Sequence, residues 1–306
     1  MSNRPWATPG SPGHASGRPL VASSLRRLAR GLAGTVLATG LAAGAANAAD
    51  LTMGISEGTS GGLDHAQVIA KYQPLANVIA AAIGAKVDVV FVREFKALES
   101  GMQTNRFDFM MARPSDYPAR GLRDYKYRFV ASAKPDGQCL IVVPRDSPIK
   151  TLADAKGKRF VMPEKVSYMS RFCAAELRDQ GILLDKENVK YVREQGAVTF
   201  YMDNHFSDVG GLASYSGAAK KWLQAGNRVI HKSVEQPYFP LIASGEIPEA
   251  QVAAARKAVL SLGETPAGQA VLKGIGIERF DAGGEQRLRE LLKWLGTEAT
   301  EATAAK

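Results

Sequence analysis

One short stretch of the chain has the residue types and spacing of a catalytic motif. Gly58-Thr59-Ser60-Gly61-Gly62 matches G-x-S-x-G, in which a sharp turn between a strand and a helix exposes a nucleophilic serine. A hydrolase of that fold builds several strands before this turn, and no later Asp and His stand at evident strand ends. We therefore expect no catalytic residue and no enzyme activity. The stretch is interpreted as a flexible loop whose N–H groups and Ser60 face a binding cleft.

Residues 1–48 have the pattern of an export signal. Residues 26–30 are basic, residues 31–45 form a run rich in Ala and Gly, and Ala46-Asn47-Ala48 matches the small-x-small cleavage pattern. The run is too short and too weakly apolar for a comfortable membrane span. We therefore expect a cleavable signal peptide over 1–48 and a mature protein in the periplasm.

The net charge of +9 does not indicate nucleic-acid binding. The chain has 39 Lys and Arg against 30 Asp and Glu, and five of the arginines lie in residues 1–48, which contain no acid. The later residues carry an excess of four positive charges. That small excess is compatible with a small anionic ligand and is a poor basis for binding a polynucleotide.

Cys139 and Cys173 are the two cysteines of the chain, and an oxidising compartment favours a disulfide between them. The bridge would close a loop of about 33 residues and contribute on the order of 3 kcal/mol. The alternative is that a thiol binds a soft metal or metalloid. The sequence has no C-x-x-C, H-E-x-x-H, P-loop or dinucleotide fingerprint. We therefore expect no metal and no cofactor.

Strand and helix signals alternate along the mature chain. The first series comprises strands at 51–55, 86–92 and 107–111 with helices at 66–83 and 95–103. The second comprises strands at 139–143, 159–161, 189–192 and 208–212 with a helix at 170–180. After about residue 237 the chain becomes mainly helical. The β-α-β order predicts an α/β fold with mostly parallel sheets.

The two series predict two lobes joined by extended segments near 132–140 and 232–240. We expect the first lobe over 49–135, the second over 136–235, and a return to the first lobe with C-terminal helices over 236–306. Because ligands in open α/β sheets bind beyond the carboxyl ends of the strands, the cleft between the lobes is the expected binding site, and it can close about a hinge.

Four stretches of the sequence together indicate a known protein family more specifically than any one of them alone. They are residues 72–75 (Tyr-Gln-Pro-Leu) leading to 83–87 (Ile-Gly-Ala-Lys-Val), residues 97–101 (Ala-Leu-Glu-Ser-Gly) before 106–108 (Arg-Phe-Asp), residues 146–158 (Asp-Ser-Pro-Ile-Lys-Thr-Leu-Ala-Asp-Ala-Lys-Gly-Lys), and residues 237–240 (Pro-Tyr-Phe-Pro). With these stretches the chain resembles the phosphate/phosphite/phosphonate-type periplasmic solute-binding proteins of ABC transporters. The resemblance covers essentially all of the chain after residue 48.

The resemblance implies a type II-like two-lobed fold with a hinge and a ligand at the start of the second lobe's first helix. Family members carry Ser-Thr-Ser-Gly there, and the hydroxyls and helix N–H groups hold a phosphorus oxyanion. Ser167, Tyr168 and Ser170 occupy this place here, and Met169 stands where the family has glycine. Helix capping is the other role open to the two serines.

In the first lobe, the family's glycine-proline-x-x-tyrosine loop corresponds to residues 113–117. The resemblance implies that Ser115 and Tyr117 supply ligand hydroxyls. Arg113 stands in place of the small residue. Its guanidinium could clamp an oxyanion with two hydrogen bonds, lie on the surface, or form an ion pair between the lobes. We expect that its replacement leaves the folded protein little affected.

Asp208 begins a strand in a stretch that resembles a family turn. We expect it at the strand end facing the cleft, where it would bind a ligand amine or hold the lobes closed.

The function implied by the resemblance is that of a monomeric solute-binding component of an ABC importer, which takes a small oxyanion to a membrane permease. The alternative is a sensory module that presents a ligand such as arsenite, bound by a cysteine, to a membrane histidine kinase.

Overall fold

A six-stranded sheet organises the first lobe. The computed structural model describes residues 50–60 and 62–296, with β1 to β4 and β10 to β11 in this sheet. The strands are β1 (Asp50–Ser56), β2 (Lys86–Phe91), β3 (Phe109–Ala112), β4 (Arg128–Gly137), β10 (Gln236–Ala243) and β11 (Arg279–Asp281). Their order is β11-β4-β10-β3-β1-β2. The pairs β1–β2 and β1–β3 are parallel, and the other three are antiparallel.

A five-stranded sheet organises the second lobe. Its strands are β5 (Cys139–Val143), β6 (Arg159–Pro163), β7 (Asn188–Val192), β8 (Val209–Ala213) and β9 (Arg228–Lys232). Their order is β7-β6-β8-β5-β9. Strand β6 is parallel to β7 and β8, whereas β5 is antiparallel to β8 and β9.

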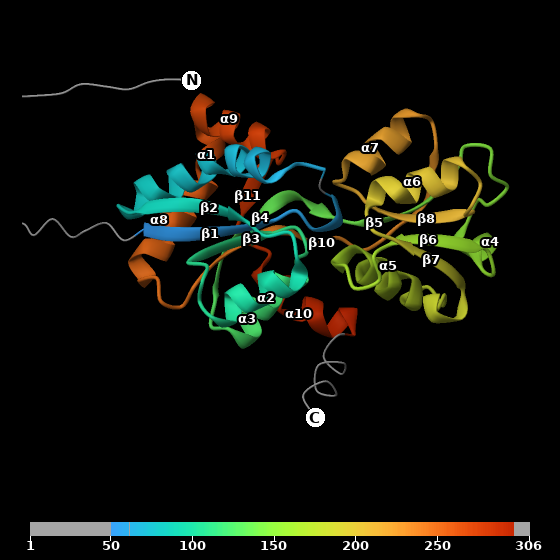
Figure 1. The fold of residues 1–306 in the computed structure, drawn as a ribbon, viewed down its shortest axis with the longest axis horizontal. Coiled ribbons are helices and arrows are strands. Elements are labelled where there is room, and N and C mark those ends of the chain that lie inside the picture. Colours follow the sequence, from blue (N-terminus) through green and yellow to red (C-terminus); the bar gives the residue numbers. More distant parts are fainter. Residues whose placement is uncertain (1–49, 61, 297–306) are drawn as a thin grey trace, which may run out of the picture. The chain divides into compact units, whose positions relative to one another are not determined.

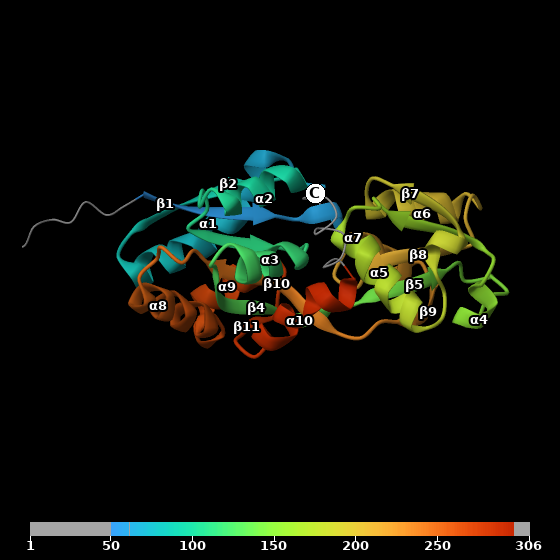
Figure 2. The same ribbon diagram turned by 90° about the horizontal axis from the view of Figure 1, so that it is seen from below.

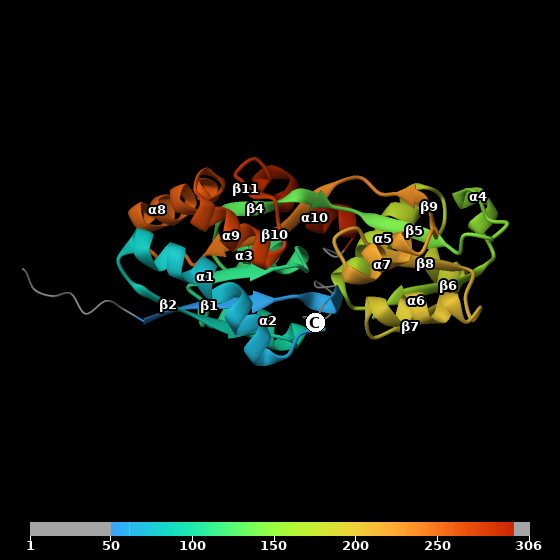
Figure 3. The ribbon, with the colours of Figure 1, turned by 90° about the horizontal axis from the view of Figure 1, so that it is seen from above.

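The sheets are therefore mixed, and the expectation of mostly parallel sheets is wrong for both. The β-α-β parts of each sheet are parallel as predicted. The pair β4–β10 is antiparallel because the chain leaves the first sheet through β4 and comes back beside it through β10. Figures 2 and 3 show the two connections between the sheets, β4 to β5 in green and β9 to β10 in orange.

Helices cover both faces of each sheet (Figure 1). In the first lobe one face is covered by α1 (His65–Ile83), α8 (Glu249–Leu260) and α9 (Pro266–Ile275), and the other by α2 (Phe95–Gln103), α3 (Asp116–Asp124) and α10 (Glu285–Leu295). In the second lobe α5 (Tyr168–Asp179) covers one face, α6 (Gln195–Asp203) and α7 (Gly217–Gln224) cover the other, and α4 (Leu152–Ala155) is short. Three 3-10 turns span Gly58–Ser60, Leu184–Lys186 and Leu262–Glu264. No helix in these described ranges is both long and apolar enough to cross a membrane.

Helix α1 shows how local residue types set the element bounds. Asp64 caps its start, because its side chain accepts a hydrogen bond from Gln67 N at 2.8 Å while the Gln67 side chain accepts one from Asp64 N. Gly84 ends it with φ of 67°, a left-handed conformation that glycine adopts without steric cost. The helix end predicted from the sequence is confirmed.

Candidate functional site

Three cavities that share Thr59 lie near the carboxyl ends of strands from both sheets, and one of them extends along α6 and α7. The middle one, here named the central cleft, has room for about one water molecule, with a volume of about 10 Å³. Its lining consists of Glu57, Gly58, Thr59, Phe95, Arg113, Pro114, Ser167, Tyr168, Met169, Gln195 and Tyr215. Cavities of about 530 and 590 Å³ flank it, and Thr59 lines all three. The cleft expected between the lobes is therefore present, at the predicted ends of the strands.

Arg113 supplies a buried positive charge to the central cleft. It directly follows β3, it is 8% exposed, and its Nη2 lies 3.7 Å from Glu57 Oε1. Its guanidinium carbon also lies 5.2 Å from the ring centre of Phe239 and 5.7 Å from that of Tyr238. Burial alone would lower the pKa of Arg113, but the neighbouring Tyr238, Tyr72 and Glu57 raise it above its ordinary value. The guanidinium therefore stays charged throughout the physiological pH range.

Glu57 joins this arginine to α1. Its Oε1 accepts hydrogen bonds from Lys71 Nζ at 2.7 Å and from the Tyr72 hydroxyl at 2.6 Å. Burial alone would raise the pKa of Glu57, yet the Arg113 charge and these two hydrogen bonds outweigh it and hold the pKa below its usual value. Two cations thus surround one carboxylate, and one of the two, Arg113, lines the central cleft together with Glu57.

The start of α5 forms the opposite wall. Ser167 is the N-cap, and its Oγ accepts a hydrogen bond from Ser170 N at 3.3 Å. Tyr168 and Met169 follow as the first two helical residues and line the central cleft. The N–H groups in the first turn of a helix have no intrahelical partner, and the helix dipole adds positive potential there. The start of α5 therefore favours negative charge on this side of the central cleft, and the Arg113 guanidinium is the cation of the opposite wall.

The sequence matches one family model across most of its length. That model describes the periplasmic substrate-binding protein of a phosphonate ABC transporter, and it matches residues 62–287. The chain belongs to this family. A search of curated proteins found no match to the sequence.

Solved structures similar to this phosphonate-type binding protein share its two-lobed fold. XAC2383 from Xanthomonas citri, bound to ATP, has a TM-score of 0.66 at 17% identity, over 81% of this chain and 97% of that one. PhnD1 from Prochlorococcus marinus, in complex with methylphosphonate, also has a TM-score of 0.66, at 12% identity, over 82% and 98%. A binding protein component of an ABC phosphonate transporter from Pseudomonas aeruginosa has a TM-score of 0.60 at 15% identity, over 80% and 85%.

The structure places only some of the predicted ligand-binding residues of this binding protein at the central cleft. Arg113, Ser167 and Tyr168 line the central cleft. Ser60 belongs to the 3-10 turn that follows β1, and its side chain is outside the described part of the chain. The direct roles of these residues in ligand binding stay predictions.

Ser115, Tyr117 and Ser170 lie close by but line none of the three cavities. Ser115 Oγ donates to the Pro237 carbonyl at 2.8 Å, and Ser170 Oγ donates to the Pro163 carbonyl at 2.5 Å. Tyr117 is 5% exposed, and its ring stacks on Phe95 with the ring centres 5.8 Å apart. In this arrangement their side chains stabilise the loops that form the central cleft.

Asp208 is not at the cleft end of its strand, and that prediction is wrong. It precedes β8, and its carboxylate accepts hydrogen bonds from Arg159 N at 3.0 Å and from Arg159 Nη2 at 2.6 Å. In the first lobe, Asp108 likewise precedes β3 and accepts from Thr52 N at 2.7 Å. Each aspartate therefore joins the amino ends of two parallel strands, the edge of the sheet opposite to the cleft.

Contacts between the lobes involve residues that the sequence did not single out. Asp116 is fully buried, and its Oδ2 accepts a hydrogen bond from Arg171 Nη1 of α5 at 3.0 Å. Burial raises the pKa of Asp116, while Arg171 opposes that shift. Tyr215, two residues after the end of β8, stacks on Tyr238 of β10 with ring centres 4.2 Å apart. The sequence indicated only that Asp116 belongs to the predicted ligand loop, residues 113–117. Its contact with Arg171 could not be predicted, because the two residues are 55 positions apart in the sequence.

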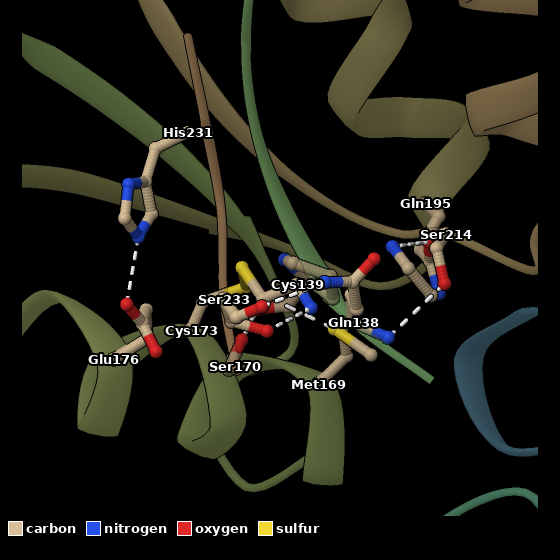
Figure 4. The surroundings of a disulfide bond; sticks show 12 residues. Gln138, Cys139, Met169, Ser170, Cys173, Glu176, Gln195, Ser214, His231 and Ser233 are labelled. Carbon is tan, nitrogen blue, oxygen red and sulfur yellow. Dashed lines mark hydrogen bonds and ion pairs between the residues drawn. A yellow bond between two sulfur atoms is a disulfide. The ribbon is translucent and has the colours of Figure 1, made fainter. Parts of the chain in front are cut away.

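The predicted disulfide between Cys139 and Cys173 is confirmed (Figure 4). It ties α5 to β5, and both cysteines are fully buried. One turn further along α5, Glu176 accepts a hydrogen bond from Val234 N at 3.1 Å and lies 2.7 Å from His231 Nε2. The helix that forms one wall of the central cleft is therefore anchored firmly in its own lobe. No thiol is left to bind a metalloid such as arsenite.

Proposed function

We propose that this phosphonate-type binding protein holds a small oxyanion of the phosphonate, phosphate or phosphite class in the central cleft, which has room for about one water molecule in this arrangement and must widen to admit the anion. It then carries the anion to the permease of an ABC transporter. The observation that carries the proposal is the buried, charged Arg113 opposite the first turn of α5. No bond is made or broken in this role, so the protein acts as a carrier in the periplasm and needs no catalytic group.

The two walls can share one ligand because oxyanions accept several hydrogen bonds in different directions. Arg113 offers a charge-assisted donor from the first lobe. The Tyr168 and Met169 N–H groups, with the Ser167 hydroxyl, offer neutral donors from the second lobe. A ligand that bridges both walls stabilises the closed state, because it has no such pair of contacts when the lobes are apart.

The ligands of two similar structures support a phosphorus oxyanion. One structure holds methylphosphonate and the other holds ATP, and both ligands carry tetrahedral phosphorus with anionic oxygens. The flanking cavities of about 530 and 590 Å³ give space for a substituent larger than methyl. The substituent is the part of the ligand that these cavities would select.

A thermal-shift screen tests this function. The screen compares phosphate, phosphite, methylphosphonate, sulfate, arsenate and arsenite, each against sodium chloride at matched ionic strength. An anion present at a hundred times its Kd should stabilise the fold by about 2.7 kcal/mol, or raise the melting temperature by about 5–10 °C. We expect at least one phosphorus oxyanion to do so. Melting temperatures that match the chloride control for all phosphorus oxyanions would contradict the proposal.

A further inference from the structure

The C-terminal helix α10 packs into the apolar core of both lobes. It lies against α3 of the first lobe and α5 of the second (Figures 1 and 2). Its buried side chains are Leu288, Leu291, Leu292 and Leu295. All four belong to one apolar cluster that also contains Leu98 and Phe107 of the first lobe and Phe160 and Phe172 of the second. The two lobes are thus joined by this helix as well as by the two connecting segments.

The first turn of α10 is fastened to the connecting segments. Arg287 Nη2 donates to Asp136 Oδ2 at 2.7 Å, and Arg287 Nη1 donates to the Glu235 carbonyl at 3.4 Å. Asp136 lies near the end of β4, where the chain leaves the first lobe, and Glu235 lies just before β10, where it returns. One arginine of α10 therefore contacts both connections.

The last turn of α10 is fastened to α5. Trp294 Nε1 donates to Asp179 Oδ2 at 2.8 Å, and Arg178 Nη2 donates to the Trp294 carbonyl at 3.0 Å. The Trp294 ring also packs edge-on against Phe172, with ring centres 5.3 Å apart. Nine residues earlier, α10 begins at Glu285, so the helix spans about 15 Å from the connections to the second lobe.

Helix α5 is consequently held at both of its ends by elements outside its own lobe. Arg171 in its first turn pairs with Asp116, and Asp179 at its last residue pairs with Trp294. The family match stops at residue 287, so the stretch of α10 that reaches α5 lies beyond the part of the chain that the family model describes.

We propose that α10 is a strap that holds the two lobes in the closed arrangement. Trp294 is its positioning residue, because it acts on the central cleft through α5 and touches no part of the cleft. In this proposal the opening of the lobes breaks the Trp294 contacts or moves α10 away from α3, because α10 contacts both lobes. The strap therefore raises the closed population of the unliganded protein, and the inference stands whether or not the proposed ligand class is correct.

Small-angle X-ray scattering on the purified protein without ligand tests the strap. Trp294→Ala removes the ring and the indole donor, and Asp179→Ala removes the acceptor from a half-exposed side chain whose loss does not threaten the core. The matched control is Arg289→Ala, since Arg289 pairs with Glu285 within α10 itself. We expect a larger radius of gyration for the first two variants and an unchanged value for the control.

A binding measurement with methylphosphonate as probe provides a second readout. If the closed fraction falls, the apparent Kd rises in proportion, and we expect a two- to tenfold rise in Trp294→Ala and Asp179→Ala. Scattering profiles identical to wild type in both variants would overturn the strap. An equal expansion in Arg289→Ala would also overturn it, because the effect would then reflect general loosening of α10. A change in scattering without any methylphosphonate binding would retain the strap and reject only methylphosphonate as a ligand.

Discussion

Replacing Cys139 and Cys173 together by alanine should lower the free energy of unfolding by about 3–4 kcal/mol. The bridge joins residues separated by 34 positions, and a closed loop of that size restricts the unfolded chain by about this amount. Both sulfurs are fully buried, so their removal also leaves unfilled space beside β5 and α5. Urea unfolding of the wild type and the double variant, followed by circular dichroism, measures the difference.

Two controls accompany this measurement. Thiol titration of denatured, unreduced wild type should find no free thiol, and reduction should release two, since the chain has two cysteines. Adding a reductant to the double variant should leave its unfolding midpoint unchanged. A difference in unfolding free energy below about 1 kcal/mol would show that the bridge contributes little to stability.

Arg113→Met should weaken binding of the best anion from the screen by about ten- to a hundredfold, because a charge-assisted hydrogen bond in a desolvated cleft is lost. Ser167→Ala, which removes one neutral hydroxyl, should cost only about 1 kcal/mol of binding free energy. Isothermal titration calorimetry measures both. The matched control is Arg93→Met, because Arg93 is exposed at the edge of the flanking cavity of about 530 Å³ and carries the same charge.

The Arg113 variant should also melt at a lower temperature than the wild type. Arg113 is 8% exposed and sits against Glu57, so its removal leaves that buried carboxylate with fewer partners. Lys71 and Tyr72 still donate to Glu57, which limits the loss. Unchanged affinity in Arg113→Met, or an equal loss in Arg93→Met, would show that Arg113 does not clamp the anion.

Much of the fold could be predicted because its signals are local in the sequence. The alternation of apolar strands and periodic helices gave the two lobes, and Gly84 marked the end of α1 through its own backbone preference. The antiparallel pairs were missed for a different reason. Whether β10 returns beside β4 or elsewhere depends on contacts between segments about a hundred residues apart, which no local pattern encodes.

The candidate site could be predicted only in outline. The strand ends and the start of α5 are visible in the sequence, so Arg113 and Ser167 were found. The expectation that Arg113 could be removed without harm is at odds with its burial, because its partners Glu57 and Tyr238 come from distant strands. Asp208 was misplaced because its bond to Arg159 spans 49 residues, and only that bond assigns it to the amino end of β8.

Nuclear magnetic resonance mapping of the anion is the most direct test of binding between the two lobes. Backbone amide shifts are recorded while the wild type is titrated with the phosphorus oxyanion that stabilises it most in the thermal screen. We predict saturable changes on both walls of the central cleft, at residues 57–59 and 113 of the first lobe and 167–169 of the second. Changes confined to one lobe, or lying away from the central cleft, would contradict the account.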